Sequence, residues 1–166
     1  MKNLIFIIIS FSLGFLIGFL SKFTYELNTF KPYDWQEPPV IINCYGKKFS
    51  KLHIIRAIEY WTVRNHKLGG YIHRPSSYLC DNEWLEGYII LRVDEKMSGV
   101  TLARTKRYTS LNNVVGAVIS FQPDSFNLYL LNEHEIGHAL GYSHVDVKGH
   151  VMHPIHESMG LDFYMK

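Results

Sequence analysis

Residues 134–144 read HEIGHALGYSH and contain three histidines and one glutamate within eleven positions. In a helix, His134 and His138 are four residues apart, so both imidazoles leave the same face about one turn apart. Two ring nitrogens arranged in this way can bind one zinc ion at about 2.0–2.1 Å. The stretch therefore predicts a helix that carries a metal site on one face.

Gly141 is expected to end this helix, because glycine readily adopts the left-handed conformation at a helix C-terminus. The chain can then turn back and present His144 as a third ligand. Three protein ligands leave the fourth position of zinc open to water, as in catalytic rather than structural sites. Glu135 is expected beside that position as a general base. A solvated histidine-rich helix is the alternative, but it does not explain the position of Gly141.

A methionine follows the motif in a short loop. Met152 lies eight residues after His144, between Gly149 and Pro154. The pattern H-E-x-x-H-x-x-G-x-x-H with a methionine turn resembles the metzincin clan of zinc endopeptidases. The proline two residues after the methionine is most similar to the matrixins. The resemblance implies that Met152 forms a hydrophobic floor beneath one catalytic zinc ion held by the three motif histidines.

The order of expected elements indicates an α/β (α+β) fold, with a twisted, mixed, five-stranded sheet and an active-site helix packed under it. Strands are expected at 40–44, 68–74, 87–93, 99–105 and 116–121. A first helix is expected to run from Ser50 to about His66. The active-site helix is expected to begin at Asp124 or Ser125.

The resemblance also implies that the fourth strand is an antiparallel edge strand, which binds extended substrate by β-augmentation. The residues expected to make this contact are Val100, Thr101, Leu102, Ala103, Arg104 and Thr105. Three further histidines near the methionine are expected on the surface, although one of them could stabilise a developing oxyanion. They are His150, His153 and His156.

Residues 4–20, LIFIIISFSLGFLIGFL, form an uncharged run at the short end of the length that spans a membrane. They predict a single-pass signal anchor over residues 1–21 that places the following domain on the non-cytoplasmic side. The alternative is secretion after signal cleavage, but the run is long for a cleaved signal and no A-x-A site follows. Gly14 and Gly18 form a G-x-x-x-G that weakly suggests dimerisation in the membrane.

The rest of the chain is divided into a linker over residues 22–39 and a peptidase domain over residues 40–166. Cys44 and Cys80 either pair as a disulfide, which would fit export, or remain as two buried thiols. The formal net charge of +2 and the lack of a basic run argue against nucleic acid as a partner.

Together these features predict a membrane-anchored zinc endopeptidase that acts on extended proteins or peptides. Two alternatives stay open. One is a non-catalytic zinc-bearing module that holds peptides along the edge strand. The other is a zinc hydrolase that acts on another amide, such as a cell-wall peptide. Glu135 argues against the binding module, since such a module needs no base at that position.

Overall fold

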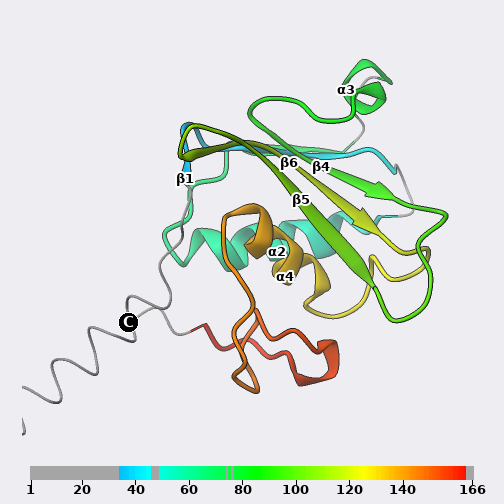
Figure 1. The fold of residues 1–166 in the computed structure, drawn as a ribbon, viewed down its shortest axis with the longest axis vertical. Helices are drawn as coiled ribbons and strands as arrows, with labels where there is room; N and C mark the ends of the chain where they lie inside the picture. Colours follow the sequence, from blue (N-terminus) through cyan, green and yellow to red (C-terminus); the bar gives the residue numbers. More distant parts are fainter. Residues whose placement is uncertain (1–33, 46–48, 74, 76, 164–166) are drawn as a thin grey trace, which may run out of the picture. The chain divides into compact units, whose positions relative to one another are not determined.

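The computed structural model describes residues 34–163, apart from 46–48, 74 and 76. Six strands are present in this part (Figure 1): β1 (Asp34–Trp35), β2 (Val40–Asn43), β3 (Gly70–Ile72), β4 (Tyr88–Val93), β5 (Ala103–Ser110) and β6 (Asn113–Phe121). The helices are α2 (Lys51–Thr62), α3 (Ser77–Asp81), α4 (Leu131–Ala139) and the short 3-10 helix η2 (His156–Ser158). None of these helices has the length and apolar character of a membrane span, and the predicted anchor over residues 4–20 lies outside the described residues.

Strand β6 organises the sheet because it is paired along both of its edges. On one side it pairs with β5 in antiparallel register, from Ala103↔Phe121 to Ser110↔Asn113. On the other side it pairs in parallel with β4, and then β2 and β3 follow, also in parallel. The sheet is therefore mixed, as predicted. Counted from Val40, the fourth strand is the antiparallel edge strand, which is also as predicted.

The prediction of five strands is wrong, because the described sheet has six. The additional strand β1 lies in the segment that was expected to be a linker, and it pairs with the first two residues of β6. Its position is also held by Trp35, whose Nε1 donates a hydrogen bond to the carbonyl oxygen of Ala139 at 2.9 Å. A strand of two residues is too short to show an alternating pattern, so it could not be predicted from the sequence.

The predicted bounds of the edge strand are also wrong. β5 begins at Ala103, so Val100, Thr101 and Leu102 precede the strand, and Val100 is 99% exposed. The strand continues through Lys106 to Ser110. Charged side chains are tolerated inside an edge strand because its outer positions face solvent. The apolar residues before Ala103 therefore predicted a strand that begins and ends too early in the chain.

Helix α4 begins at Leu131, not at Asp124 or Ser125 as predicted. Asp124 and Leu130 have φ angles of +68° and +62°, which a continuous right-handed helix does not allow. The Ser125 hydroxyl does not cap the helix. It donates instead to the carbonyl oxygen of Leu102 at 2.6 Å, and this bond ties the segment before α4 to the segment before β5.

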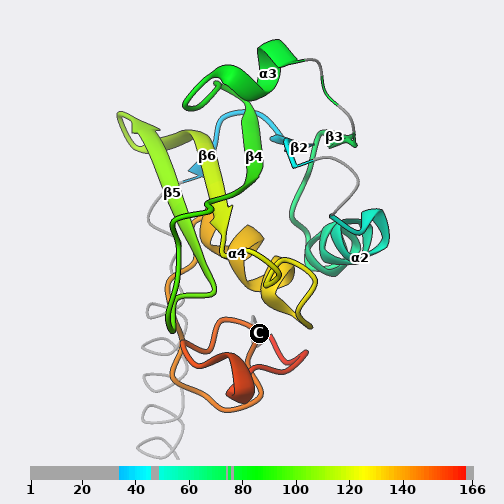
Figure 2. The ribbon, with the colours of Figure 1, turned by 90° about the vertical axis from the view of Figure 1, so that its right-hand side faces the viewer.

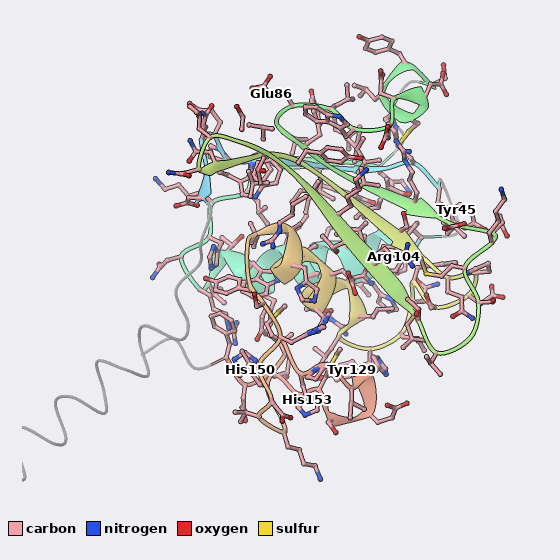
Figure 3. All side chains as sticks on the ribbon, viewed as in Figure 1. Tyr45, Glu86, Arg104, Tyr129, His150 and His153 are labelled. Carbon is pink, nitrogen blue, oxygen red and sulfur yellow. A yellow bond between two sulfur atoms is a disulfide. The ribbon has the colours of Figure 1, made fainter. Side chains whose placement is uncertain are left out.

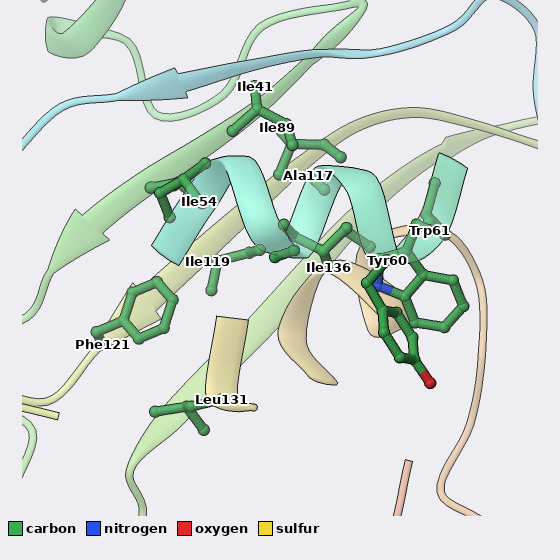
Figure 4. Packing of buried hydrophobic residues seen from close by; sticks show 14 of the residues in the cluster. Ile41, Ile54, Tyr60, Trp61, Ile89, Ala117, Ile119, Phe121, Leu131 and Ile136 are labelled. Atoms are coloured by element: carbon green, nitrogen blue, oxygen red, sulfur yellow. The ribbon is translucent and has the colours of Figure 1, made fainter. Parts of the chain in front are cut away.

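Helices α2 and α4 cover the same face of the sheet (Figures 1 and 2), and most of the core lies between them and the strands. Alternate strand residues point into this core (Figure 4), and they include Ile41, Ile89, Ala117 and Ile119. Helix α2 adds Ile54 and Trp61, and α4 adds Ile136. The prediction that α2 would continue to His66 is wrong, because Asn65 has a φ of +66°.

The opposite face of the sheet carries a smaller cluster of Ile42, Ile90 and Val118, against which Leu79 of α3 packs. No residue of α3 is fully buried, so few apolar contacts hold this short helix in place. A disulfide between Cys44 and Cys80 provides the missing attachment, with an S–S distance of 2.04 Å. Of the two states that the sequence left open for these cysteines, the structure contains the disulfide.

Gly137 allows α4 to approach its neighbours more closely than any other residue would. A Cβ atom at this position would lie less than 3.0 Å from Met152 Sδ and from Trp61 Cζ2. The indole Nε1 of Trp61 also donates to the carbonyl oxygen of Glu133 at 2.8 Å, so α2 and α4 are held together at this point. Both neighbours are fully buried and have little space into which they could move.

The variant Gly137→Ala should therefore be less stable, although alanine is the better helix former. We expect the free energy of unfolding to fall by about 1–3 kcal/mol, the usual cost of overpacking a core. Urea unfolding measures this change, and a Gly137→Ala/Met152→Ala double variant should lose less stability than the sum of the two single variants, because the clash with the Met152 sulfur is gone. A Gly137→Ala protein as stable as the original would show that the close approach is not a constraint.

Candidate functional site

The three histidines predicted as metal ligands lie together. Each of the three residues, His134, His138 and His144, offers one ring nitrogen, and these three atoms lie within 4.8 Å of one another. The Nε2 atoms of His138 and His144 are 3.1 Å apart. Two ligands at 2.0–2.1 Å on a tetrahedral ion would be about 3.3 Å apart. Within the described part of the chain, no other group of histidine, cysteine or acidic residues is arranged in this way.

Backbone carbonyls fix the orientation of two of these rings. His134 Nδ1 donates to the carbonyl oxygen of Val151 at 2.8 Å, and His138 Nδ1 donates to that of Tyr142 at 2.8 Å. A carbonyl oxygen can only accept, so Nδ1 carries the proton and Nε2 presents its lone pair. Histidines that bind metals are usually oriented by a hydrogen bond of this kind. The donor set therefore fits a metal ion.

The turn after α4 brings the third histidine back to the first two. Gly141 has a φ of +105°, a conformation that favours glycine. The amide of Tyr142 donates to the carbonyl oxygen of Gly137, and the amide of Gly141 donates to that of His138, both at 3.0 Å. These two bonds form a Schellman motif that ends the helix and reverses the chain toward His144. The predicted stop at Gly141 is confirmed.

Met152 packs against Gly137 of α4, in a loop that is hydrogen-bonded to the segment after His144. It is fully buried, and its sulfur faces Gly137. The amide of Val145 donates to the carbonyl oxygen of Met152 at 2.9 Å, which joins the segment after His144 to the loop. Because the preceding carbonyl, that of Val151, orients His134, the loop contributes to ligand geometry as well as to packing.

The prediction that the neighbouring histidines lie on the surface is wrong for two of them. His150 and His153 are only 3% and 6% exposed, in the loop that follows α4 (Figure 3). His150 Nδ1 accepts a hydrogen bond from the amide of Met152 at 3.0 Å, and His153 Nδ1 accepts one from the amide of Ile155 at 3.0 Å. Both rings therefore hold the methionine loop in shape. Their spacing in the sequence gave no indication of this role.

Glu135 is 5% exposed and faces the edge strand. Its Oε2 accepts a hydrogen bond of 2.5 Å from Thr105 Oγ1 on β5. Burial raises the pKa of Glu135 to about 7, and the hydrogen bond from Thr105 opposes that shift. Thr105 was predicted as a substrate contact, but its hydroxyl is directed at Glu135. The two residues are 30 positions apart, so no local pattern could reveal the contact.

The histidines are uncharged near neutral pH. Burial lowers the pKa of His134 to about 3 and that of His138 to about 4. Repulsion from His138 adds to the effect at His134, and repulsion from His144 and Arg107 adds to it at His138. Burial also lowers the pKa of His144. Metal ions bind the neutral form of imidazole, so the site is ready to accept one without first losing protons.

Two hollows meet at Glu135 and His144. The larger has a volume of about 630 Å³ and is lined by four of the predicted substrate residues, Val100, Thr101, Leu102 and Ala103. Across it lie Leu131 of α4 and the segment after Pro154. The smaller, of about 270 Å³, is lined by Ala103, Arg104, Thr105 and Arg107 of β5. All six predicted substrate residues therefore line a hollow that metal-binding histidines also line.

Comparison with known proteins agrees with this geometry. A family model described as matrixin matches residues 45–163, which is well over half of the chain and includes the three histidines, Glu135 and Met152. No curated protein matches the chain. The extent of the family match and the grouping of the motif residues lead to one conclusion: the chain belongs to the matrixin family.

Proposed function

We propose that the protein is a zinc-dependent endopeptidase that hydrolyses peptide bonds in extended proteins or peptides. The observation that carries the proposal is a buried carboxylate, Glu135, beside three converging imidazoles. Imidazole ligands suit zinc, and three of them leave its fourth position open. When bound, zinc would polarise the scissile carbonyl and lower the pKa of water to about 7.

The chain's own residues would bind the metal ion and transfer the protons. His134, His138 and His144 would hold the ion. Glu135 would accept a proton from the attacking water and later deliver it to the leaving amine. Burial raises the pKa of Glu135, which favours the protonated form and so helps the carboxyl group to hold the proton that it accepts. Thr105 would fix the carboxylate by binding Oε2, which leaves Oε1 to face the water.

The open edge of β5 supports an extended substrate. Among the described residues, β5 pairs only with β6, so the backbone groups on its other edge have no strand partner. A peptide added along this edge would cross Glu135 and have one hollow on each side of the reacting bond. A zinc hydrolase that acts on a cell-wall peptide would use the same strand edge, hollows and metal ligands. A non-catalytic binding module would use these features too, but it would not need Glu135.

Replacing Glu135 separates catalysis from binding. For the full-length chain purified with zinc, we expect near-stoichiometric metal and cleavage of a mixed peptide library that a chelator abolishes. Glu135→Ala should retain zinc but lose activity by about 10²–10⁴-fold, the usual contribution of a general base. Glu59→Ala, at an exposed position of α2, is the matched control and should cleave normally. Zinc binding without any cleavage would favour the binding module, or an amide absent from the library.

The bond from Thr105 can be tested in the same assay. Thr105→Val removes the hydroxyl and keeps the shape, so we expect kcat to fall by about 10-fold or more, as for one hydrogen bond to a charged group. KM should change little, and Thr105→Ser should restore most of the activity. Thr109→Val makes the same change further along β5 and serves as the control. A rise in KM at constant kcat would assign Thr105 to substrate binding instead.

We also propose that residues 4–20 anchor the protein in a membrane, with the peptidase domain on the non-cytoplasmic side. The support is the uncharged apolar run in the sequence. The full-length chain should stay in the membrane fraction after alkaline carbonate washing, at the mass of the uncleaved chain. Ile9→Lys/Leu13→Lys places two charges in the run and should release it. A mature protein that lacks residues 1–21 would instead show secretion after cleavage.

A further inference from the structure

We propose that Arg107 forms an anion-binding subsite beside the metal centre, which selects substrates with an aspartate or glutamate side chain near the scissile bond. This inference rests on the proposed peptidase function and adds the chemical class of substrate. The ligand is a carboxylate, and the position that it occupies is the smaller of the two hollows beside the three histidines.

The position of Arg107 on β5 directs its side chain toward the metal centre. Side chains alternate along a strand, and Thr105, two residues earlier, points at Glu135. Arg107 therefore shares the face of β5 that covers α4. It lines the hollow of about 270 Å³ together with Glu135, His138 and His144. The neighbouring Lys106 points to the opposite face, where its Nζ lies 3.0 Å from Glu83.

The guanidinium of Arg107 has a donor that is not used. Its Nη1 is buried and has no hydrogen-bond partner. Within the described residues, no carboxylate forms an ion pair with Arg107, whereas Arg56 pairs with Glu133 and Lys106 pairs with Glu83. Buried polar atoms nearly always have a partner, so an unused donor on a residue that lines a hollow marks a place for an acceptor from a ligand.

The chemistry of the hollow favours a carboxylate as that acceptor. Guanidinium donors form a planar fork that matches the two oxygens of a carboxylate. Glu135 is the one acidic residue in the lining, and it already accepts a bond from Thr105. A metal cation at the histidines would add further positive charge to the same space. An incoming acidic side chain would therefore be attracted by two positive charges, those of Arg107 and the metal ion, against the one negative charge of Glu135.

A peptide on the open edge of β5 would bring such a side chain within reach. Residues of an added strand alternate between the two faces of the sheet, so those near Arg107 that point toward α4 enter the hollow. The strand direction of the peptide decides whether the acidic residue precedes or follows the scissile bond. A peptide library that varies every position shows directly on which side of the scissile bond the acidic residue is preferred.

The test uses the zinc-loaded full-length chain and peptides that differ at one position, with glutamate compared against the isosteric glutamine. Peptides with amidated and with free C-termini are compared, because a terminal carboxylate could supply the same chemistry. At one position we expect kcat/KM to favour glutamate by roughly tenfold or more, the size of one charge-assisted hydrogen bond. Binding of the same peptides is measured by fluorescence anisotropy, which does not depend on cleavage.

Three variants connect the preference to Arg107. Arg107→Gln should reduce the glutamate preference to within about twofold. Arg107→Glu should reverse it in favour of lysine at the same position, which also shows that the variant is folded. Lys106→Gln removes the same charge from the neighbouring residue and should leave both the preference and the activity on the glutamine peptide unchanged. Zinc content is measured for every variant.

The outcomes distinguish this inference from the proposed function. Cleavage by the original chain without a glutamate preference at any position would overturn the subsite and leave the peptidase intact. A preference that Arg107→Gln retains, or that Lys106→Gln removes equally, would also overturn it. If no peptide is cleaved but binding favours glutamate in an Arg107-dependent way, the subsite is supported and the peptidase proposal fails. A preference confined to free C-termini would identify the terminal carboxylate as the ligand.

Discussion

The contact of Gly137 with Met152 and Trp61 is the constraint on which the metal centre depends. Helix α4 carries only two of the three histidines, while the orientation of His134 depends on a carbonyl in the methionine loop. That loop can lie against the helix because the helix surface is bare at Gly137. On the other side, Trp61 fixes the same turn of α4 against α2. The absence of a side chain at Gly137 thus allows α2, α4 and the methionine loop to pack against one another.

Burial then gives the polar residues of α4 their chemical properties. Almost every residue of this helix is buried, including Glu133, His134 and Glu135. Each has a partner: Arg56 for Glu133, the Val151 carbonyl for His134 and Thr105 for Glu135. Loss of solvent keeps imidazoles neutral and makes a carboxylate more basic. The same environment therefore prepares the ligands for a metal ion and the glutamate for proton transfer.

The features that the sequence predicted are those set by neighbouring residues. The grouping of the histidines and the helix end at Gly141 follow from spacing and from the conformational freedom of glycine, and both were correct. The wrong predictions concern features that depend on a contact with a residue outside the local sequence pattern. Strand β1 exists because β6 pairs with it, and α4 starts late in a segment where Ser125 binds Leu102. His150 is buried because the amide of Met152 donates to its ring.

The open edge of β5 also bears on how the protein behaves toward copies of itself. An unpaired edge is a template on which any extended segment can add a strand, including the same strand of a second molecule. β5 carries Arg104, Lys106 and Arg107 among its first five residues. In an antiparallel pair of two such strands centred on Lys106 or on Arg107, that residue would lie opposite its own copy, and like charges opposite each other destabilise the pairing. The positive charge of the strand therefore disfavours these pairings of β5 with its own copy.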